Sequence, residues 1–103
     1  QQMQQNQTAI LRIILEMQGA SISSVTSNVI TYTPYGASTT RTISKSGTNL
    51  LLHRNSDNTN HILVGNVSAF AASYSNSTLS FTLTTTFSNS ATQSFSTSAY
   101  LSN

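Results

Sequence analysis

Charge is the scarcest property of this sequence. Of its 103 residues only 6% are charged, four of them basic and two acidic, whereas about 25% is typical of globular proteins. Serine, threonine, asparagine and glutamine must therefore cover most of the surface. Because cytosolic proteins commonly rely on net charge for their solubility, this composition favours an exported or surface-exposed protein. The cations are scattered along the chain rather than clustered as a nucleic-acid-binding face requires: they are Arg12, Arg41, Lys45 and Arg54.

Several other residue types are absent or rare. There is no cysteine, which excludes disulfides, thiolate metal sites and thiol catalysis. The chain has 4 glycines, and no Gly-rich phosphate-binding loop occurs among them. No apolar run approaches the ~18 residues of a membrane helix, and no signal peptide is present. The sequence begins with Gln1 instead of methionine, so we expect a processed or trimmed chain that lacks a segment upstream.

The residue types of catalytic sites are equally sparse. Glu16 and Asp57 are the two carboxylates, and nothing in their positions places them across a substrate as a glycosidase requires. Arg12 precedes Glu16 by one helical turn, the spacing of a same-face ion pair. Serine is abundant, but there is no Gly-x-Ser-x-Gly elbow and no spacing that supports a Ser-His-Asp triad. We therefore predict that the chain is not an enzyme and uses no cofactor. A hydrolase built on His53 or His61 is the weakest alternative.

Two kinds of binding site stay open as alternatives. His53 and His61 flank a polar loop at residues 55–60, where a hairpin would bring them near Asp57 and a metal ion. A single carboxylate supplies less negative charge than a calcium site usually gathers, so we interpret both histidines as exposed loop residues and predict no metal site. A surface that stacks single-stranded DNA would use Tyr32, Tyr35, Tyr74 and Tyr100 with Arg41 and Arg54. We prefer to interpret these tyrosines as half-buried sheet residues.

Residues 1–18 have the pattern of an amphipathic helix. Their apolar side chains recur at helical spacing: Met3, Ile10, Leu11, Ile13, Ile14, Leu15 and Met17. Gly19 predicts the end of the helix. The first turns are rich in glutamine and have no apolar stripe beyond Met3. We therefore expect the early half of the helix to project from the domain or to continue upstream.

After Gly19 the apolar period changes from helical to alternating, which is typical of strands. Residues 61–74 are predicted to be one long strand with a bulge at Gly65. The clearest strand is residues 79–87, in which large apolar residues alternate with serine and threonine. In all we predict about six strands in short antiparallel connections, at residues 29–33, 39–44, 50–52, 61–74, 79–87 and 94–101, and a weak extended segment from Val25.

These elements predict one domain, residues 1–103, of the α+β class. The N-terminal helix is expected to pack on one face of an antiparallel β-sheet. The apolar faces of the three C-terminal strands supply the surface that the helix stripe needs. Serine and threonine on the opposite face of those strands leave that side in contact with water.

Four segments of the chain carry a resemblance to a known family. They are TAILRIILEMQGA, NVITYTPYGASTTRTIS, HILVGNVSAFAASYSNSTLSFTLTTTFSN and QSFSTSAYLSN. The order of a helix with a polar start followed by weakly charged antiparallel strands resembles that of type IV pilins and pseudopilins. In detail the segments are similar to minor pseudopilins of the GspJ and PilW kind, and the resemblance covers nearly the whole chain.

The resemblance implies a pilin-like α/β roll, with residues 1–18 as the C-terminal half of a stalk helix and residues 20–103 as a β-rich head. It implies a structural minor pilin or pseudopilin subunit of a type IV pilus or type II secretion pseudopilus, for secretion, adhesion or DNA uptake. Its partners would be other subunits of that filament, and a missing apolar segment would anchor it in the inner membrane before assembly. The head would lie in the periplasm or outside the bacterial cell. The expected assembly residues are Met3, Ile10, Arg12, Ile13, Ile14 and Glu16.

An alternative from a different class is a β-rich extracellular adhesin or carbohydrate-binding module. Such modules lack a long N-terminal helix, and they usually have exposed aromatic residues and an acidic calcium site. Neither exposed aromatic residues nor an acidic calcium site is evident in this sequence, so we rank the filament subunit first.

Overall fold

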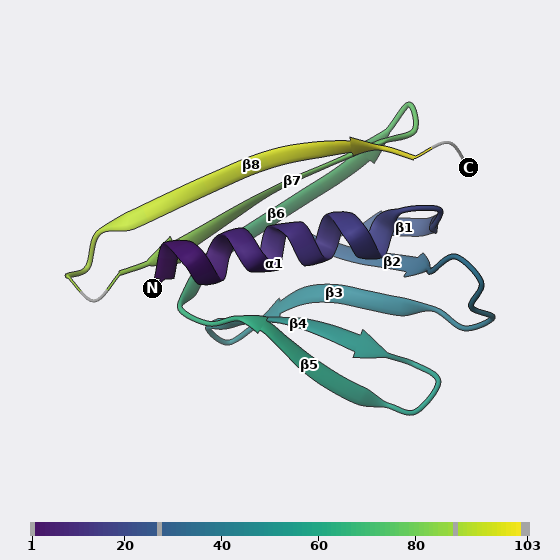
Figure 1. The fold of residues 1–103 in the computed structure, drawn as a ribbon, viewed down its shortest axis with the longest axis horizontal. Coiled ribbons are helices and arrows are strands. Elements are labelled where there is room, and N and C mark those ends of the chain that lie inside the picture. The colour runs from purple at the N-terminus through teal and green to yellow at the C-terminus, as the bar shows by residue number, and fades with distance from the viewer. Residues whose placement is uncertain (1, 27, 88, 102–103) are drawn as a thin grey trace.

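A computed structural model describes residues 2–26, 28–87 and 89–101. One helix, α1 (Gln2–Met17), is followed by eight strands in this part of the chain. The strands form two antiparallel sheets, a five-stranded one in the order β1-β2-β3-β4-β5 and a three-stranded one in the order β6-β7-β8 (Figure 1). Their bounds are β1 (Ser21–Thr26), β2 (Val29–Thr33), β3 (Arg41–Ser46), β4 (Asn49–Arg54), β5 (Thr59–Val64), β6 (Val67–Ser75), β7 (Thr78–Thr86) and β8 (Thr92–Tyr100).

The predicted α+β fold, with one helix on one sheet, is wrong. The protein is mostly β, with two antiparallel sheets and a single short helix. The error comes from residues 61–74, which belong to two strands in different sheets, β5 and β6. Asn66 lies between them with a φ of 58°, and this left-handed conformation, which asparagine tolerates, redirects the chain. The pilin-like α/β roll is overturned with it, because the strands form two antiparallel sheets instead of one sheet behind the helix.

The helix itself and its end are confirmed. Gly19 has a φ of 75°, a conformation that costs glycine little because it has no Cβ. The Ala20 N–H donates to the Met17 carbonyl at 3.0 Å, which satisfies one of the acceptors that a helix end leaves open. The chain then turns directly into β1.

The C-terminal hairpins also follow the predicted alternation. Asn76 and Ser77 join β6 to β7 with φ values of 51° and 62°, as a tight two-residue hairpin turn requires. Along β7 buried and half-buried residues alternate at every position. The buried ones are Leu79, Phe81, Leu83 and Thr85, so one face of β7 points into the core and the other toward solvent.

The core lies where α1 meets both sheets. In Figure 1 the helix crosses in front of the molecule, with β8 and β7 on one side of it and β3, β4 and β5 on the other. It packs against β5 of the first sheet and β7 of the second. These strands overlap two of the three predicted C-terminal strands, residues 61–74 and 79–87, but they belong to different sheets. The largest buried apolar side chains come from all three parts: Ile13 and Met17 from α1, Ile30, Tyr32, Ile43, Leu50 and Leu52 from the first sheet, and Phe70, Leu79, Phe81 and Leu83 from the second.

Candidate functional site

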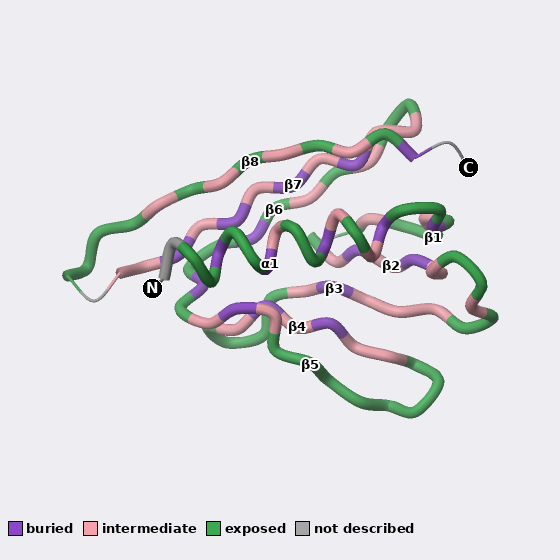
Figure 2. The backbone as a smooth tube through the Cα atoms, viewed as in Figure 1, coloured by how far each residue is buried: buried purple, intermediate pink, exposed green. Residues whose placement is uncertain are grey.

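The outer face of α1 carries an apolar surface that the domain itself leaves uncovered. Leu11 is 57% exposed and Leu15 is 60% exposed, and one helical turn separates them, so they lie side by side on the helix. The opposite face is buried in the core, through Ala9, Ile13 and Met17. Along α1, Figure 2 shows buried and exposed segments alternating with each turn. The helix is therefore apolar on two sides, of which the fold uses one.

A buried hydrogen bond fixes the first half of α1 to the second sheet. The Asn6 side-chain amide donates to the Thr85 hydroxyl at 2.6 Å, and both residues are completely buried. Thr85 lies on the core-facing side of β7, where the alternation would otherwise place an apolar residue. Because burying an amide without a partner is costly, this pair sets the position of the helix on the sheet.

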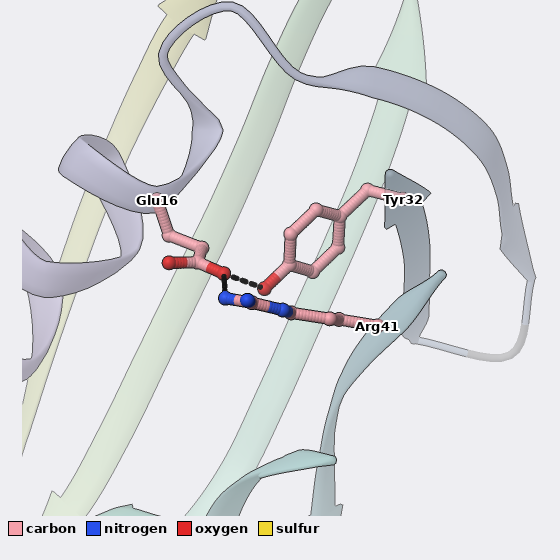
Figure 3. Close-up of polar contacts among 3 residues, drawn as sticks. All are labelled: Glu16, Tyr32 and Arg41. Atoms are coloured by element: carbon pink, nitrogen blue, oxygen red, sulfur yellow. Dashed lines mark hydrogen bonds and ion pairs between the residues drawn. The ribbon is translucent and has the colours of Figure 1, made fainter. Parts of the chain in front are cut away.

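Three polar residues fix the second half of α1 to the first sheet, as Figure 3 shows. The Tyr32 hydroxyl donates to Glu16 Oε2 at 2.9 Å, and Arg41 donates to the same oxygen. Tyr32 (β2) and Arg41 (β3) are directly opposite each other in the sheet, so both side chains reach the helix from one face. Glu16 forms its ion pair with Arg41, and the predicted pair with Arg12 is not the one that forms.

The environment of Tyr32 keeps its hydroxyl protonated. Burial raises the pKa of Tyr32 far above its ordinary value of 10.0, and the negative charge of Glu16 and the hydrogen bond to it raise it further. Arg41 acts in the opposite direction but does not compensate for these effects. The tyrosine is thus a hydrogen-bond donor to Glu16, and this group of three residues ties the helix to the sheet.

Two shallow grooves border the exposed leucines. One runs along α1 itself, where Leu11 and Leu15 are accompanied by Thr8, Arg12 and Glu16. The other lies between α1 and β8, and its lining residues are Gln7, Ile10, Leu11, Ile14, Phe95, Ser96 and Thr97. Together these grooves form a continuous, mostly apolar surface with a single free cation, Arg12, among the described residues that line it. This surface, centred on Leu11 and Leu15, is called the α1 surface below.

The predicted assembly residues are distributed over different environments. Ile13 is fully buried in the core, Ile10 and Ile14 are half-buried, and Arg12 is exposed on the α1 surface. Glu16 is held by Tyr32 and Arg41. The side chain of Met3 lies outside the described part of the chain. Sequence reasoning placed Leu11 and Leu15 in the broad apolar stripe, but only the packed structure separates the outer members of that stripe from the inner ones.

The residues considered as metal ligands are not assembled, and the two histidines lie on strands instead of in a loop, with His53 half-buried and His61 exposed. His53 on β4 is directly opposite Asn60 on β5, and His61 is opposite Leu52, so the two histidines point to opposite faces of the hairpin. His53 Nδ1 lies 2.7 Å from the Asn60 side-chain oxygen. The hydrogen bond from Thr59 lowers the pKa of Asp57. Within the described ranges, no three histidine, cysteine or acidic side chains gather in one place.

The tyrosines considered for DNA stacking are also dispersed. Tyr32 is buried and Tyr74 is half-buried, whereas Tyr35 and Tyr100 are exposed. Arg41 is engaged by Glu16. Because a stacking surface requires exposed aromatic faces next to free cations, the residues of that hypothesis do not form a common surface.

No protein-family model, no curated protein sequence and no solved structure shows a significant match to this chain. Within the residues that the structure describes, no helix combines the length and the apolar character needed to span a bilayer. The geometry of the α1 surface is therefore the main basis for a functional proposal.

Proposed function

We propose that this chain is a structural subunit of a filament at the bacterial cell surface, of the type IV pilus or type II secretion pseudopilus class. In this proposal it assembles with neighbouring subunits through the α1 surface. The observation that supports the proposal is the exposure of Leu11 and Leu15, each by more than half, on a helix whose other face already lies in the core. Contiguous exposed apolar groups of this kind mark interaction sites.

The energetics fit a repeated subunit contact. Burying a leucine side chain completely contributes about 1.5–3 kcal/mol relative to leaving it exposed, so two half-exposed leucines supply a modest contact per neighbour. The scarcity of charge supports the same interpretation, because 6% charged residues leave few ions to be desolvated when subunits meet. Neighbouring subunits of the same filament are the partners in this proposal.

The test is made in the native host by deleting the gene and restoring it as wild type, as Leu11→Gln/Leu15→Gln, or as Ile62→Gln. Glutamine keeps a high helix propensity, and Ile62 is a matched control because it is 64% exposed but lies on β5. We expect the double variant to reduce incorporation into sheared surface filaments, or secretion by the corresponding machine, by about tenfold or more. We expect Ile62→Gln to behave as wild type. The proposal is refuted if deleting the gene changes neither filaments nor secretion and the chain is absent from the filament fraction.

A second candidate is a β-rich extracellular binding module, for example one for carbohydrate. The mostly β architecture favours it, and so do Tyr35 and Tyr100, which are 84% and 73% exposed and therefore available to stack on sugar rings. Glycan-array binding that is lost in Tyr35→Ala or Tyr100→Ala would support this function. Unchanged binding in both variants would exclude these two tyrosines as the binding residues.

A further inference from the structure

The strand β8 is an unprotected sheet edge. It ends the order β6-β7-β8, and among the described residues Figure 1 shows no strand on its outer side. The three other end strands, β1, β5 and β6, each have a register shift in their pairing, and such irregularities are one way in which proteins blunt an edge. The pairing of β8 with β7 is regular over its whole length, from Thr92 to Tyr100.

The backbone groups that β8 presents to solvent follow from its register. At one end of the β7–β8 hairpin Phe87 N–H donates to Ala91, and at the other end Leu101 N–H donates to Ser77, both at 2.7 Å. Hydrogen-bonded pairs alternate with non-bonded pairs in an antiparallel ladder, so the odd-numbered residues of β8 bond to β7. The even-numbered residues direct their N–H and C=O groups outward: they are Thr92, Ser94, Ser96, Ser98 and Tyr100.

The side chains of β8 offer nothing that would prevent pairing with another strand. The strand has the sequence TQSFSTSAY, with no lysine, no acidic residue and no proline, which are common protections of natural edges. The exposed face of β8 carries only side chains with hydroxyl groups, and Gln93, Phe95, Thr97 and Ala99 lie on the half-buried face. A long, uncharged edge of this kind is a template for another strand.

We propose that β8 pairs antiparallel with β8 of a second copy of this chain, with Ser96 opposite Ser96 of that copy. This register places outward-directed residues opposite each other, Ser94 with Ser98 and Thr92 with Tyr100, so that their N–H and C=O groups bond across the two-fold axis. Hydroxyl side chains then meet hydroxyl side chains, and no like charges are opposed. The two three-stranded sheets become one six-stranded sheet.

The groove between α1 and β8 favours the same arrangement. Phe95 and Thr97 of the second copy are directly opposite Thr97 and Phe95 in this register. They project on the same side of the extended sheet as Phe95, which lines the groove together with Ile10, Leu11 and Ile14. The added strand therefore covers apolar surface and bonds to the free edge at the same time. This dimer goes beyond the proposed filament function and does not depend on it.

Proline substitution tests the edge pairing. Ser96→Pro removes an outward N–H and leaves the backbone bonds to β7 in place, and proline is tolerated in edge strands on the solvent-facing side. The substitution also removes the hydrogen bond between the Ser96 and Thr82 hydroxyls, which are 2.9 Å apart. We expect wild type to reach twice the 11.0 kDa chain mass in sedimentation equilibrium as concentration rises. Ser96→Pro should remain a monomer that still unfolds cooperatively, and Ser96→Thr, which keeps the hydroxyl group, should dimerise. Leu15 lies outside the groove between α1 and β8, so Leu15→Gln should also dimerise. The dimer and the filament proposal can therefore fail separately.

Two further variants keep the test decisive if Ser96→Pro does not fold. Ser96→Lys keeps the N–H but opposes two like charges across the axis, so its dimer should be lost at low salt and recovered at high salt. Because the chain has no cysteine, Ser96→Cys introduces the single thiol. It should form an intermolecular disulfide on mild oxidation much faster than Ser98→Cys, which faces Ser94 of the other copy. A wild-type chain that stays monomeric at all concentrations, or equal oxidation rates of the two cysteine variants, would overturn the proposal.

Discussion

At the scale of single residues, the positions that matter most in this domain are polar groups within or next to the apolar core. Glu16 is one of two acidic residues in the chain, and it is held by Tyr32 and Arg41 where α1 meets the first sheet. Asn6 and Thr85 form the corresponding link to the second sheet. A hydrogen bond inside a protein contributes about 1 kcal/mol net, but leaving one of its partners buried and unpaired costs more. These five residues therefore specify where the helix lies on the two sheets, in addition to contributing stability.

Tyr32 should make the folding stability of the protein sensitive to alkaline pH. Its pKa is raised in the folded state, so above a pH of about 10 the unfolded chain loses this proton while the folded chain keeps it. The stabilisation is fully present below the unfolded pKa and is lost progressively as the pH rises toward the folded pKa. We expect the free energy of unfolding of wild type to fall more steeply between about pH 9 and pH 11 than that of Tyr32→Phe, as measured by urea denaturation.

Tyr100→Phe is the matched control for this experiment, because Tyr100 is exposed at the end of β8. Its pH profile should follow that of wild type. A Tyr32→Phe variant whose stability falls with pH as steeply as that of wild type would show that Tyr32 does not remain protonated in the fold.

The residue scale also shows where sequence reasoning stops. The spacing of Arg12 and Glu16 correctly indicated one face of a helix, and a local ion pair was the natural prediction. The acid instead pairs with Arg41, which is 25 positions further along the chain. Nothing local in the sequence identifies that partner, because it depends on which strands of the first sheet the helix end approaches.

At the scale of elements, local sequence was a good guide to where structure begins and ends. The helix, its end at Gly19 and the strand at residues 29–33 were all predicted and are confirmed. Each depends on interactions within a few residues: helix propensity, the freedom of glycine at positive φ, and side-chain alternation. Such features are visible in sequence because they do not require knowledge of the rest of the fold.

Gly19→Ala should destabilise the protein more than Gly47→Ala. Both glycines have positive φ, 75° and 60°, a conformation that costs other residues roughly 1–2 kcal/mol. A Cβ at Gly19 would in addition lie 3.0 Å from Tyr35 Cβ, whereas a Cβ at Gly47 meets no atom within 4 Å. Urea denaturation of the two variants should therefore give a loss of about 1 kcal/mol for Gly47→Ala and a clearly larger loss for Gly19→Ala. Equal losses would mean that Tyr35 moves away freely.

The main error at the element scale was residues 61–74. Apolar residues occur on both sides of Gly65 and Asn66, so the pattern predicted one strand with a bulge at Gly65. Alternation describes which face of a strand is buried, but it does not say which sheet the strand joins. The positive φ of Asn66 sends the second half of this segment to another sheet, and asparagine occurs too often in this chain for one such residue to be noticed in advance.

At the scale of the whole molecule, the two sheets share one core through α1. Ile13 is fully buried on a helix that packs against strands of both sheets. The sheets also contact each other directly, because β6 of the second sheet packs against β1, β3 and β4 of the first. A domain of 103 residues has little stability to spare. The protein should therefore unfold as one cooperative unit.

Ile13→Ala should lower the stability of both sheets together. Truncating a buried isoleucine costs about 2–5 kcal/mol, whereas Ile62→Ala, at a position that is 64% exposed, should cost about 0.5 kcal/mol or less. Hydrogen exchange followed by mass spectrometry measures the effect on separate peptides. Peptides from β2–β4 and from β7 should lose the same amount of protection in Ile13→Ala. Loss confined to one sheet would show that the sheets unfold independently.

The sequence by itself determined the composition of the surface, the helix and its end, the alternation of β7 and β8, and the absence of a recognisable catalytic pattern. These depend on residue type and on contacts between near neighbours. The tertiary structure decided that there are two sheets, that Glu16 pairs with Arg41, that Leu11 and Leu15 face solvent while Ile13 is buried, and that β8 is a free edge. Each of these depends on contacts between residues far apart in the chain, and the amphipathic pattern of one segment does not specify which distant surface will cover it.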